Sequence, residues 1–125
     1  NVVGTSFLPF PVEVKDPEGQ KFAETYKDEY KKEIEYLSSL SFVETMALCE
    51  ATQRAAEAGK LDKDAIAAEM RRTDRKTILG RVQFDAVGEN PNFALAMGQH
   101  RQGKIVLVYP QESANGQIAY PALPW

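Results

Sequence analysis

The sequence predicts an α/β fold, and three observations support this prediction. Residues 77–109 contain three short apolar or alternating runs separated by turn residues, which is typical of strands joined by tight connections. Residues 16–72 instead show apolar positions at helical spacing, behind recognisable helix caps. Hydrophobic residues make up 43% of the 125-residue chain and charged residues 26%, which is the composition of a globular domain.

The chain opens on a strand-like run, residues 2–10, that contains Pro9 and is followed by Pro11. Because proline has no N–H to donate to a sheet, strand pairing is expected to stop there. Residues 11–15 are expected to form an extended connector. A start inside a strand predicts that the chain is the C-terminal piece of a longer protein.

A first helix is expected from Asp16, whose side chain can cap it, with Pro17 at the first helical position. Phe22, Tyr26 and Tyr30 recur every four residues and therefore share one face. Such a stripe could stack on a ligand, but its spacing favours ordinary packing against a sheet.

A second helix is expected to begin at Ser41, because Ser41 and Glu44 have the spacing of a capping box. It should run to about Ala58, with Gly59 ending it. Its many alanines make it slim, so we expect it to be well buried. Cys49, in its middle, is interpreted as a buried structural thiol rather than a nucleophile.

A third helix is expected from the capping residue Asp62 to about Arg72, with Ile66 and Met70 facing inward. The basic stretch that follows, 71–76, is interpreted as a solvated surface first and a docking surface second.

Three strands are predicted in the last third of the chain. The first covers 77–85 and ends at a turn cluster, 88–91. The second covers 93–99, and large and small side chains alternate over 93–97. Gly103 lets the chain reverse by adopting a positive φ, and the apolar third strand, 105–109, is expected to be covered on both faces.

The sequence contains no motif for catalysis, metal binding or a nucleotide cofactor. The one histidine, His100, has no partner at a metal-ligand or catalytic spacing and is expected at the surface beside the hairpin turn. Asp85 and Glu89 resemble a carboxylate pair, but roles in the turn suit them better. We therefore predict no catalytic residues, no metal and no cofactor, and hence no enzyme.

Charge and hydropathy argue against two further classes of protein. The net charge is −3 and basic residues do not form a large cluster, so no nucleic-acid partner is expected. No apolar run approaches the ~20 residues of a membrane helix.

Several stretches resemble one known family. Residues 77–88 read t-x-x-G-x-v-x-F-D-x-x-G, residues 99–110 read Q-x-x-x-G-K-x-v-x-v-y-P, and the chain ends on Tyr, Pro and Trp within 120–125. Residues 22–26 match a helix pattern, F-x-x-x-Y, and residues 47–51 lie where the same family has its A-x-x-l-x-x-A-l helix. In this order and spacing, the chain resembles the periplasmic solute-binding proteins of branched-chain amino-acid-type ABC transporters, which have the type 1 periplasmic binding fold.

The resemblance implies a C-terminal fragment of a two-lobe fold, with helices packed on a mostly parallel sheet and a chain that crosses the hinge. Residues 1–10 would end one lobe and enter the hinge. Residues 11–98 would form part of the other lobe, and residues 99–125 would return through the hinge as a tail. Chains of that family are much longer, so the remaining N-terminal part of the same protein is an expected partner.

The resemblance also implies a periplasmic function: capture of a small organic acid or amino acid in the interlobe cleft, and delivery to an ABC permease in the membrane. Phe42 corresponds to an aromatic position of the family, more often tyrosine, and Phe7 and Phe10 lie at the hinge-side end of the first strand. These three phenylalanines are the implied ligand contacts. They suit a solute with an apolar body, aromatic or branched-chain.

Two other functions stay open from the sequence. A cytoplasmic ligand-sensing regulator can share this fold, and a small α/β domain can have an enzymatic or adaptor role that no motif reveals. The absence of catalytic constellations in the sequence favours a binding protein.

Overall fold

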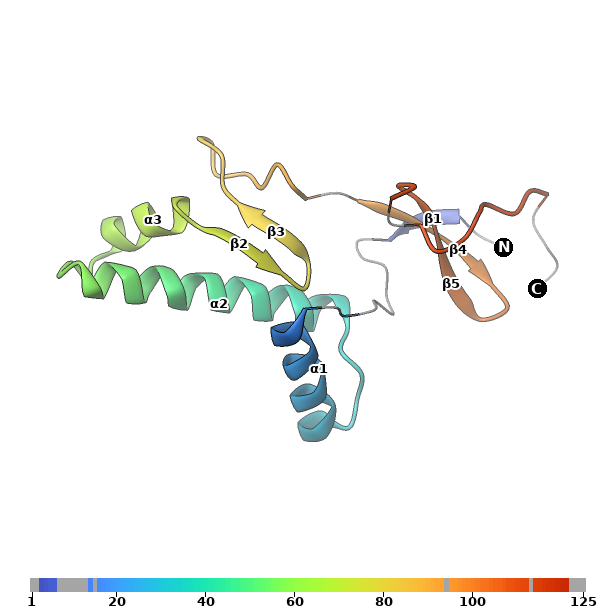
Figure 1. The fold of residues 1–125 in the computed structure, drawn as a ribbon, viewed down its shortest axis with the longest axis horizontal. Coiled ribbons are helices and arrows are strands. Elements are labelled where there is room, and N and C mark those ends of the chain that lie inside the picture. Colours follow the sequence, from blue (N-terminus) through green and yellow to red (C-terminus); the bar gives the residue numbers. More distant parts are fainter. Residues whose placement is uncertain (1–2, 7–13, 15, 94, 113, 122–125) are drawn as a thin grey trace. The chain divides into compact units, whose positions relative to one another are not determined.

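The structure, a computed structural model, describes residues 3–6, 14, 16–93, 95–112 and 114–121 (Figure 1). Helices and strands both appear among them, so the predicted α/β class is confirmed. No helix in these residues is long and apolar enough to cross a membrane. The elements in chain order are β1 (Val3–Ser6), α1 (Pro17–Tyr30), α2 (Tyr36–Glu57), α3 (Lys63–Arg71), β2 (Asp74–Thr77), β3 (Gly80–Gln83), β4 (Ala96–Arg101) and β5 (Lys104–Tyr109).

The chain divides into two compact units, and each is described by itself below. One unit comprises Val14–Phe93 and contains the three helices and the β2–β3 hairpin (Figure 1). The other comprises Asn1–Glu13 and Ala94–Trp125, and contains a three-stranded sheet in the order β1-β4-β5.

The observed strand pairings differ from one expectation about the sheet. In the described residues β1 pairs with β4, β4 with β5 and β2 with β3, and each pairing is antiparallel. These residues therefore do not form the expected mostly parallel sheet. For β2–β3 and β4–β5 the reason is local, because tight turns join these strands, and a tight turn can join only antiparallel neighbours.

Helix α1 begins as predicted. The Asp16 carboxylate accepts hydrogen bonds from the backbone N–H groups of Glu18 (3.1 Å) and Gly19 (2.9 Å), and Pro17 occupies the first turn. The buried Gly19 has no room for a side chain, since an added Cβ would lie 2.8 Å from Val14 Cγ1 and 3.2 Å from Ile78 Cβ. The start of α1 is thereby held against the β2–β3 hairpin.

Helix α2 begins at Tyr36 rather than at Ser41. Its first turn is closed by Ser38, whose Oγ accepts from the Glu35 N–H at 2.8 Å and donates to the Glu35 carbonyl at 2.8 Å. The predicted capping box of Ser41 and Glu44 was therefore wrong, because this serine–glutamate spacing also occurs inside a helix. The predicted C-terminal end is confirmed: the helix stops at Glu57, and Gly59 has a φ of 75°.

One stripe of α2 is buried and the opposite side is not. The buried residues recur every four positions: Ser39, Val43, Ala47, Ala51 and Ala55. Leu48, by contrast, is 51% exposed. The single cysteine, Cys49, is exposed as well, which corrects its interpretation as a buried thiol. Cys49 follows the buried Ala47 by two residues, and two residues turn a helix by about half a revolution.

Helix α3 is capped by Asp62, whose Oδ1 accepts from the N–H groups of Asp64 (3.0 Å) and Ala65 (2.8 Å), as predicted. Ile66 and Met70 are half-buried. The helix ends at Arg71.

The stretch 77–85 was predicted as a single strand. It contains the last residue of β2, a turn and the whole of β3. Thr77 ends β2 and pairs with Gly80 at the start of β3, leaving a two-residue turn at Ile78 and Leu79. The Thr77 Oγ1 accepts from the Leu79 N–H (3.0 Å) and donates to the Gly80 carbonyl (2.8 Å), which closes the turn. The prediction failed because the two turn residues are apolar, so only Gly80, with its φ of 94°, indicated a turn.

In the second unit, β4 begins at Ala96 and not at residue 93. Phe93 (46% exposed) precedes it and lies in the other unit. The β4–β5 reversal is as predicted, with Gln102 (φ 48°) and Gly103 (φ 73°) both left-handed. Within the described residues β5 is covered incompletely, because Leu107 is buried but Tyr109, two positions later on the same face, is 61% exposed.

A buried glutamine fixes the C-terminal segment beside this sheet. Gln99 on β4 is 1% exposed, and its Nε2 donates to the Ala119 carbonyl (3.0 Å) while its Oε1 accepts from the Ala119 N–H (2.9 Å). Leu107 on β5 donates its N–H to Asn115 Oδ1 at 2.8 Å. The backbone N–H groups of Asn115 and Gly116 also donate to the Leu107 carbonyl, so side-chain and backbone bonds together hold this segment.

Candidate functional site

The structure places one of the three predicted ligand contacts. Phe42 lies on α2, half-buried, while Phe7 and Phe10 fall outside the described residues. The Phe42 ring stacks on Phe22 of α1, with the ring centroids 4.1 Å apart and the planes inclined by 10°. Offset or parallel ring pairs of this kind add about 0.5–1.5 kcal/mol beyond area burial. Phe42 is therefore part of the joint between α1 and α2.

The aromatic stripe of α1 continues away from this joint. Tyr26 lies 5.8 Å from Phe22 and Tyr30 lies 4.8 Å from Tyr26, measured between ring centroids. Tyr30 is 61% exposed. The expectation that this stripe packs on a sheet is corrected for Phe22, which meets a helix, because α2 crosses α1 at this point.

A hollow of about 330 Å³ opens beside the stacked rings. Its volume lies within the range of small-molecule sites. Two rings and a methionine supply apolar surface, and one carboxylate and one ammonium lie at its edge. Such a surface can contact the apolar body of a solute, and the Lys21 ammonium can pair with a carboxylate, while the Glu18 carboxylate is already bonded to Arg75. The lining residues are Glu18, Lys21, Phe22, Thr25, Phe42 and Met46.

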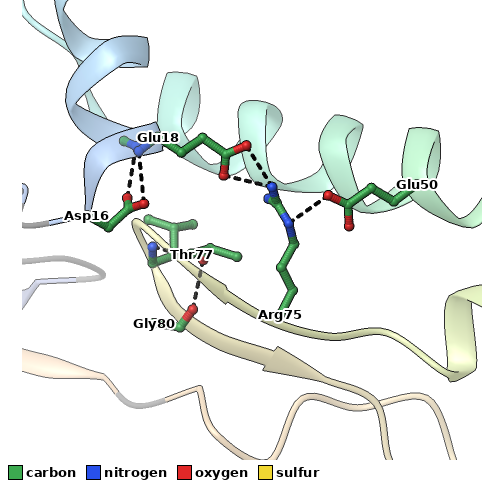
Figure 2. Close-up of polar contacts among 8 residues, drawn as sticks. Asp16, Glu18, Glu50, Arg75, Thr77 and Gly80 are labelled. Atoms are coloured by element: carbon green, nitrogen blue, oxygen red, sulfur yellow. Dashed lines mark hydrogen bonds and ion pairs between the residues drawn. The ribbon is translucent and has the colours of Figure 1, made fainter.

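An arginine on the hairpin binds carboxylates from two helices (Figure 2). The Arg75 Nη2 lies 2.7 Å from both carboxylate oxygens of Glu18 on α1, and the Nε lies 2.9 Å from Glu50 Oε1 on α2. The Arg75 side chain is only 15% exposed, which corrects its interpretation as part of a solvated basic surface. Its Nη1 is buried and has no hydrogen-bond partner among the described residues.

A second, larger hollow of about 500 Å³ lies in the same unit, and we call it the apolar groove. It is formed by one side of α2, the end of α3, the β2–β3 hairpin and the loop after β3. Most of its surface comes from aliphatic and aromatic side chains. The lining residues are Leu40, Val43, Glu44, Ala47, Met70, Leu79, Val82, Phe84, Glu89, Asn90 and Phe93.

The remaining sequence candidates have structural roles or lie at the surface. Asp85 Oδ1 accepts from the N–H groups of Val87 and Glu89, each at 2.9 Å, which confirms its predicted role in the turn. His100 is exposed near the end of β4, as expected for a surface histidine beside the hairpin turn. Within the part of the chain that the structure describes, no group of three or more acidic, histidine or cysteine side chains is placed to hold a metal.

Sequence reasoning missed Arg75, Gln99 and the apolar groove. Arg75 and Gln99 are polar residues in short strands, and their burial depends on which helices and tail segments come to lie beside them. The groove had a partial signal in the sequence. Val82 and Phe84 alternate with polar residues, which predicts one apolar side for this strand.

Comparisons with known proteins identify the fold. No protein-family model matches the sequence, and no curated protein is significantly similar to it. Among solved structures, the leucine-binding protein LivK of Thermotoga maritima matches with a TM-score of 0.69 and 27% identity, over 86% of this chain and 29% of that one. An ABC transporter substrate-binding protein of Desulfitobacterium hafniense, solved in complex with Leu, matches with a TM-score of 0.66 and 20% identity, over 85% of this chain and 30% of that one.

The chain therefore spans about 30% of the length of the solved structures that it matches. Over that span it has their fold, and the expected type 1 periplasmic binding fold is confirmed.

Proposed function

We propose that this chain, which has the type 1 periplasmic binding fold of branched-chain amino-acid-type ABC transporter proteins, forms part of a solute-binding protein. The observation that carries the proposal is the match to a leucine-binding protein over 86% of this chain, at a TM-score of 0.69.

The lobe assignment belongs to this proposal. Residues 11–98 would form part of one lobe, while residues 1–10 and 99–125 would belong to the other lobe and the hinge. The division into two compact units supports boundaries close to these. One unit is Val14–Phe93, and the other consists of the two flanking segments. A solute would be held between the lobes, so most of its contacts would come from outside this chain.

The solute would be a small amino acid or organic acid with an apolar body. The leucine-binding neighbour favours a branched-chain amino acid. An aromatic solute is the second candidate, supported by the ring surface that Phe42 contributes, together with Phe7 and Phe10. Since these three side chains bring no charge, other parts of the protein would fix the carboxylate and the ammonium group.

Delivery of this solute to an ABC permease in the membrane would place the protein in the periplasm. Osmotic-shock fractionation tests the location: the protein should leave the cell with periplasmic markers. Retention with cytoplasmic markers would contradict export and favour the ligand-sensing regulator.

Calorimetric titration of leucine into the complete gene product tests the binding function. We expect saturable binding of one leucine per protein. An absence of binding by leucine, isoleucine, valine and phenylalanine, with a protein that melts cooperatively, would contradict the proposal.

A further inference from the structure

The segment that follows β5 is attached to the sheet of its own unit at two points, and we call residues 114–119 the strap. The first attachment is on β5. The N–H of Leu107 donates to Asn115 Oδ1 at 2.8 Å, and the Leu107 carbonyl accepts from the N–H groups of Asn115 (3.1 Å) and Gly116 (3.2 Å). The approach is close, because a Cβ added to Gly116 would lie 2.5 Å from Val106 Cγ1.

The second attachment is on β4 and centres on Gln99, which is 1% exposed. Its Nε2 donates to the Ala119 carbonyl (3.0 Å), and its Oε1 accepts from the Ala119 N–H (2.9 Å). The same Oε1 accepts from Arg101 Nε at 2.8 Å, and Arg101 Nη2 donates to the carbonyl of Gln117. Leaving a buried amide without its partners is costly, so Gln99 stabilises the attached state of the strap.

Burial of apolar surface contributes little to this attachment. None of the strap residues is buried. Ile118 is 58% exposed, and Tyr120, directly after the strap, is 92% exposed. Segments with few buried apolar contacts open at a lower free energy than the strands beside them. The strap should therefore open by itself when its polar attachments are lost, while the sheet stays formed.

The strands beneath the second attachment lead to both connections between the two compact units. The units divide after Glu13 and again after Phe93. Strand β1 precedes the first division, and strand β4 begins shortly after the second. Gln99 of β4 pairs with Val3 of β1 in the ladder between these strands. The order of the strap is thus coupled, through one buried side chain, to the strand pair that carries both connections.

We propose that the strap regulates solute binding through Gln99. The attached strap orders the pair of strands β1 and β4, and its release loosens that pair and lowers the affinity for the solute. Gln99 is then a positioning residue, which acts through the strands and not by contact with the solute. Local opening can couple to a distant binding site in this way without changing the contacts to the ligand. The inference rests on the proposed function and adds its regulation.

Hydrogen exchange on the complete gene product, with and without leucine, tests the coupling. Coupling between two equilibria is reciprocal, so a strap whose attachment raises the affinity for leucine must itself be held more firmly when leucine is bound. We expect the backbone amides of Asn115, Gly116 and Ala119 to exchange about fivefold or more slowly in saturating leucine. A strap with a structural role alone would exchange at the same rate in both samples, and that result would overturn the inference.

A variant of the buried glutamine tests the direction of the effect. Gln99→Met keeps the length of the side chain and removes its hydrogen bonds. We expect the strap amides to exchange about tenfold or more faster in this variant, while the amides of the β4–β5 ladder keep their natural rates. The dissociation constant for leucine, measured by titration, should rise about fivefold or more.

Two further variants complete the set. Asn115→Ala removes the attachment on β5 and should change strap exchange and leucine affinity in the same direction, which keeps the test valid if Gln99→Met does not fold. Gln117→Ala is the matched control. Its side chain is exposed, and only its backbone carbonyl takes part in the attachment, so exchange and affinity should both stay unchanged.

The outcomes separate this inference from the proposed function. Faster strap exchange with the natural affinity for leucine would overturn the inference and leave the proposed function intact. Unchanged strap exchange in both strap-releasing variants would do the same, as would equally faster exchange along the whole β4–β5 ladder, because the strap would then not open by itself. If the natural protein binds none of leucine, isoleucine, valine and phenylalanine, the proposed function fails and the inference fails with it.

Discussion

The guanidinium of Arg75 and the carboxylate of Glu18 lie 2.7 Å apart, although 57 positions separate the two residues in the chain (Figure 2). Arg75 also binds Glu50 at 2.9 Å, so one side chain on β2 holds the N-terminal turn of α1 and the middle of α2. These contacts fix the crossing of α1 and α2, and with it the stacked rings of Phe22 and Phe42. The hollow beside those rings therefore depends on an ion-pair cluster that contributes Glu18 to its lining.

Replacing Arg75 by methionine should lower the free energy of unfolding by about 1–3 kcal/mol. Hydrogen bonds to charged groups contribute to stability on this scale. The side chains of Glu18 and Glu50 are 40% and 36% exposed, so the loss of stability should be smaller than for a fully buried ion pair. Urea denaturation measures the change. Arg81→Met is the control, because Arg81 pairs with Asp74 at an exposed site on the same hairpin and should matter less. Equal losses in both variants would contradict this role for Arg75.

Phe42→Ala and Phe22→Ala should each destabilise the protein by about 1–3 kcal/mol, because each removes one half of the same stacked pair and leaves a partly filled space. Both rings line the same hollow, so the two variants compare their contributions to solute binding. If Phe42 contacts the solute, Phe42→Ala loses affinity relative to the natural protein, as measured by titration at a temperature where both proteins are folded. An unchanged affinity in Phe42→Ala would leave Phe42 with a packing role alone.

The ionisation of Glu69 should make the stability of the packed helices α2 and α3 depend on pH. Hydrogen bonds from Arg54 first, and then from Arg72, lower the pKa of Glu69 below its ordinary value of 4.5. Because the folded-state pKa is depressed, the ionised group stabilises the fold above that ordinary value. The contribution disappears as the pH falls through the lowered pKa.

Glu69→Gln should therefore be less stable than the natural protein near neutral pH and should converge with it in acid. Urea midpoints measured from about pH 7 down to about pH 3 test this. Glu24→Gln, on the exposed side of α1, should leave the pH profile unchanged. A constant difference between Glu69→Gln and the natural protein across the range would contradict the expectation.

The β4–β5 turn offers a test of backbone conformation alone. Gly103 has a φ of 73° and an added Cβ would meet no atom within 4 Å, so Gly103→Ala changes strain and not packing. We expect a loss of about 1 kcal/mol. Gln102 has a φ of 48°, and Gln102→Asn should raise the melting temperature because asparagine tolerates this conformation better. A destabilised Gln102→Asn would contradict this view of the turn.

Local chemistry made much of the fold predictable. Asp16, Asp62 and Gly59 ended or began helices where the sequence placed them, because caps depend on residues within a few positions. Gly103 likewise lies in a turn where the sequence predicted one, between β4 and β5. The start of α2 was missed because Ser41 and Glu44 repeat a capping pattern inside a helix.

The site was less predictable because it depends on distant residues. Arg75 was assigned to the surface, and its burial follows from Glu18 and Glu50, which no local pattern relates to it. Phe42 was singled out through a family resemblance, and its stacking on Phe22 could not be read from either sequence neighbourhood. The buried Gln99 bonds to Ala119, which lies 20 positions later, and also accepts from Arg101 Nε.

A thermal-shift screen of the complete gene product tests the central claim most directly. The panel holds leucine, isoleucine, aromatic acids of the benzoate and cinnamate type, sugars and polyamines. A solute that binds only the folded state raises the melting temperature with concentration, as RT ln(1 + [L]/Kd) requires. The account predicts a rise with a branched-chain amino acid, or failing that with an aromatic acid. A rise only with sugars or polyamines would contradict it.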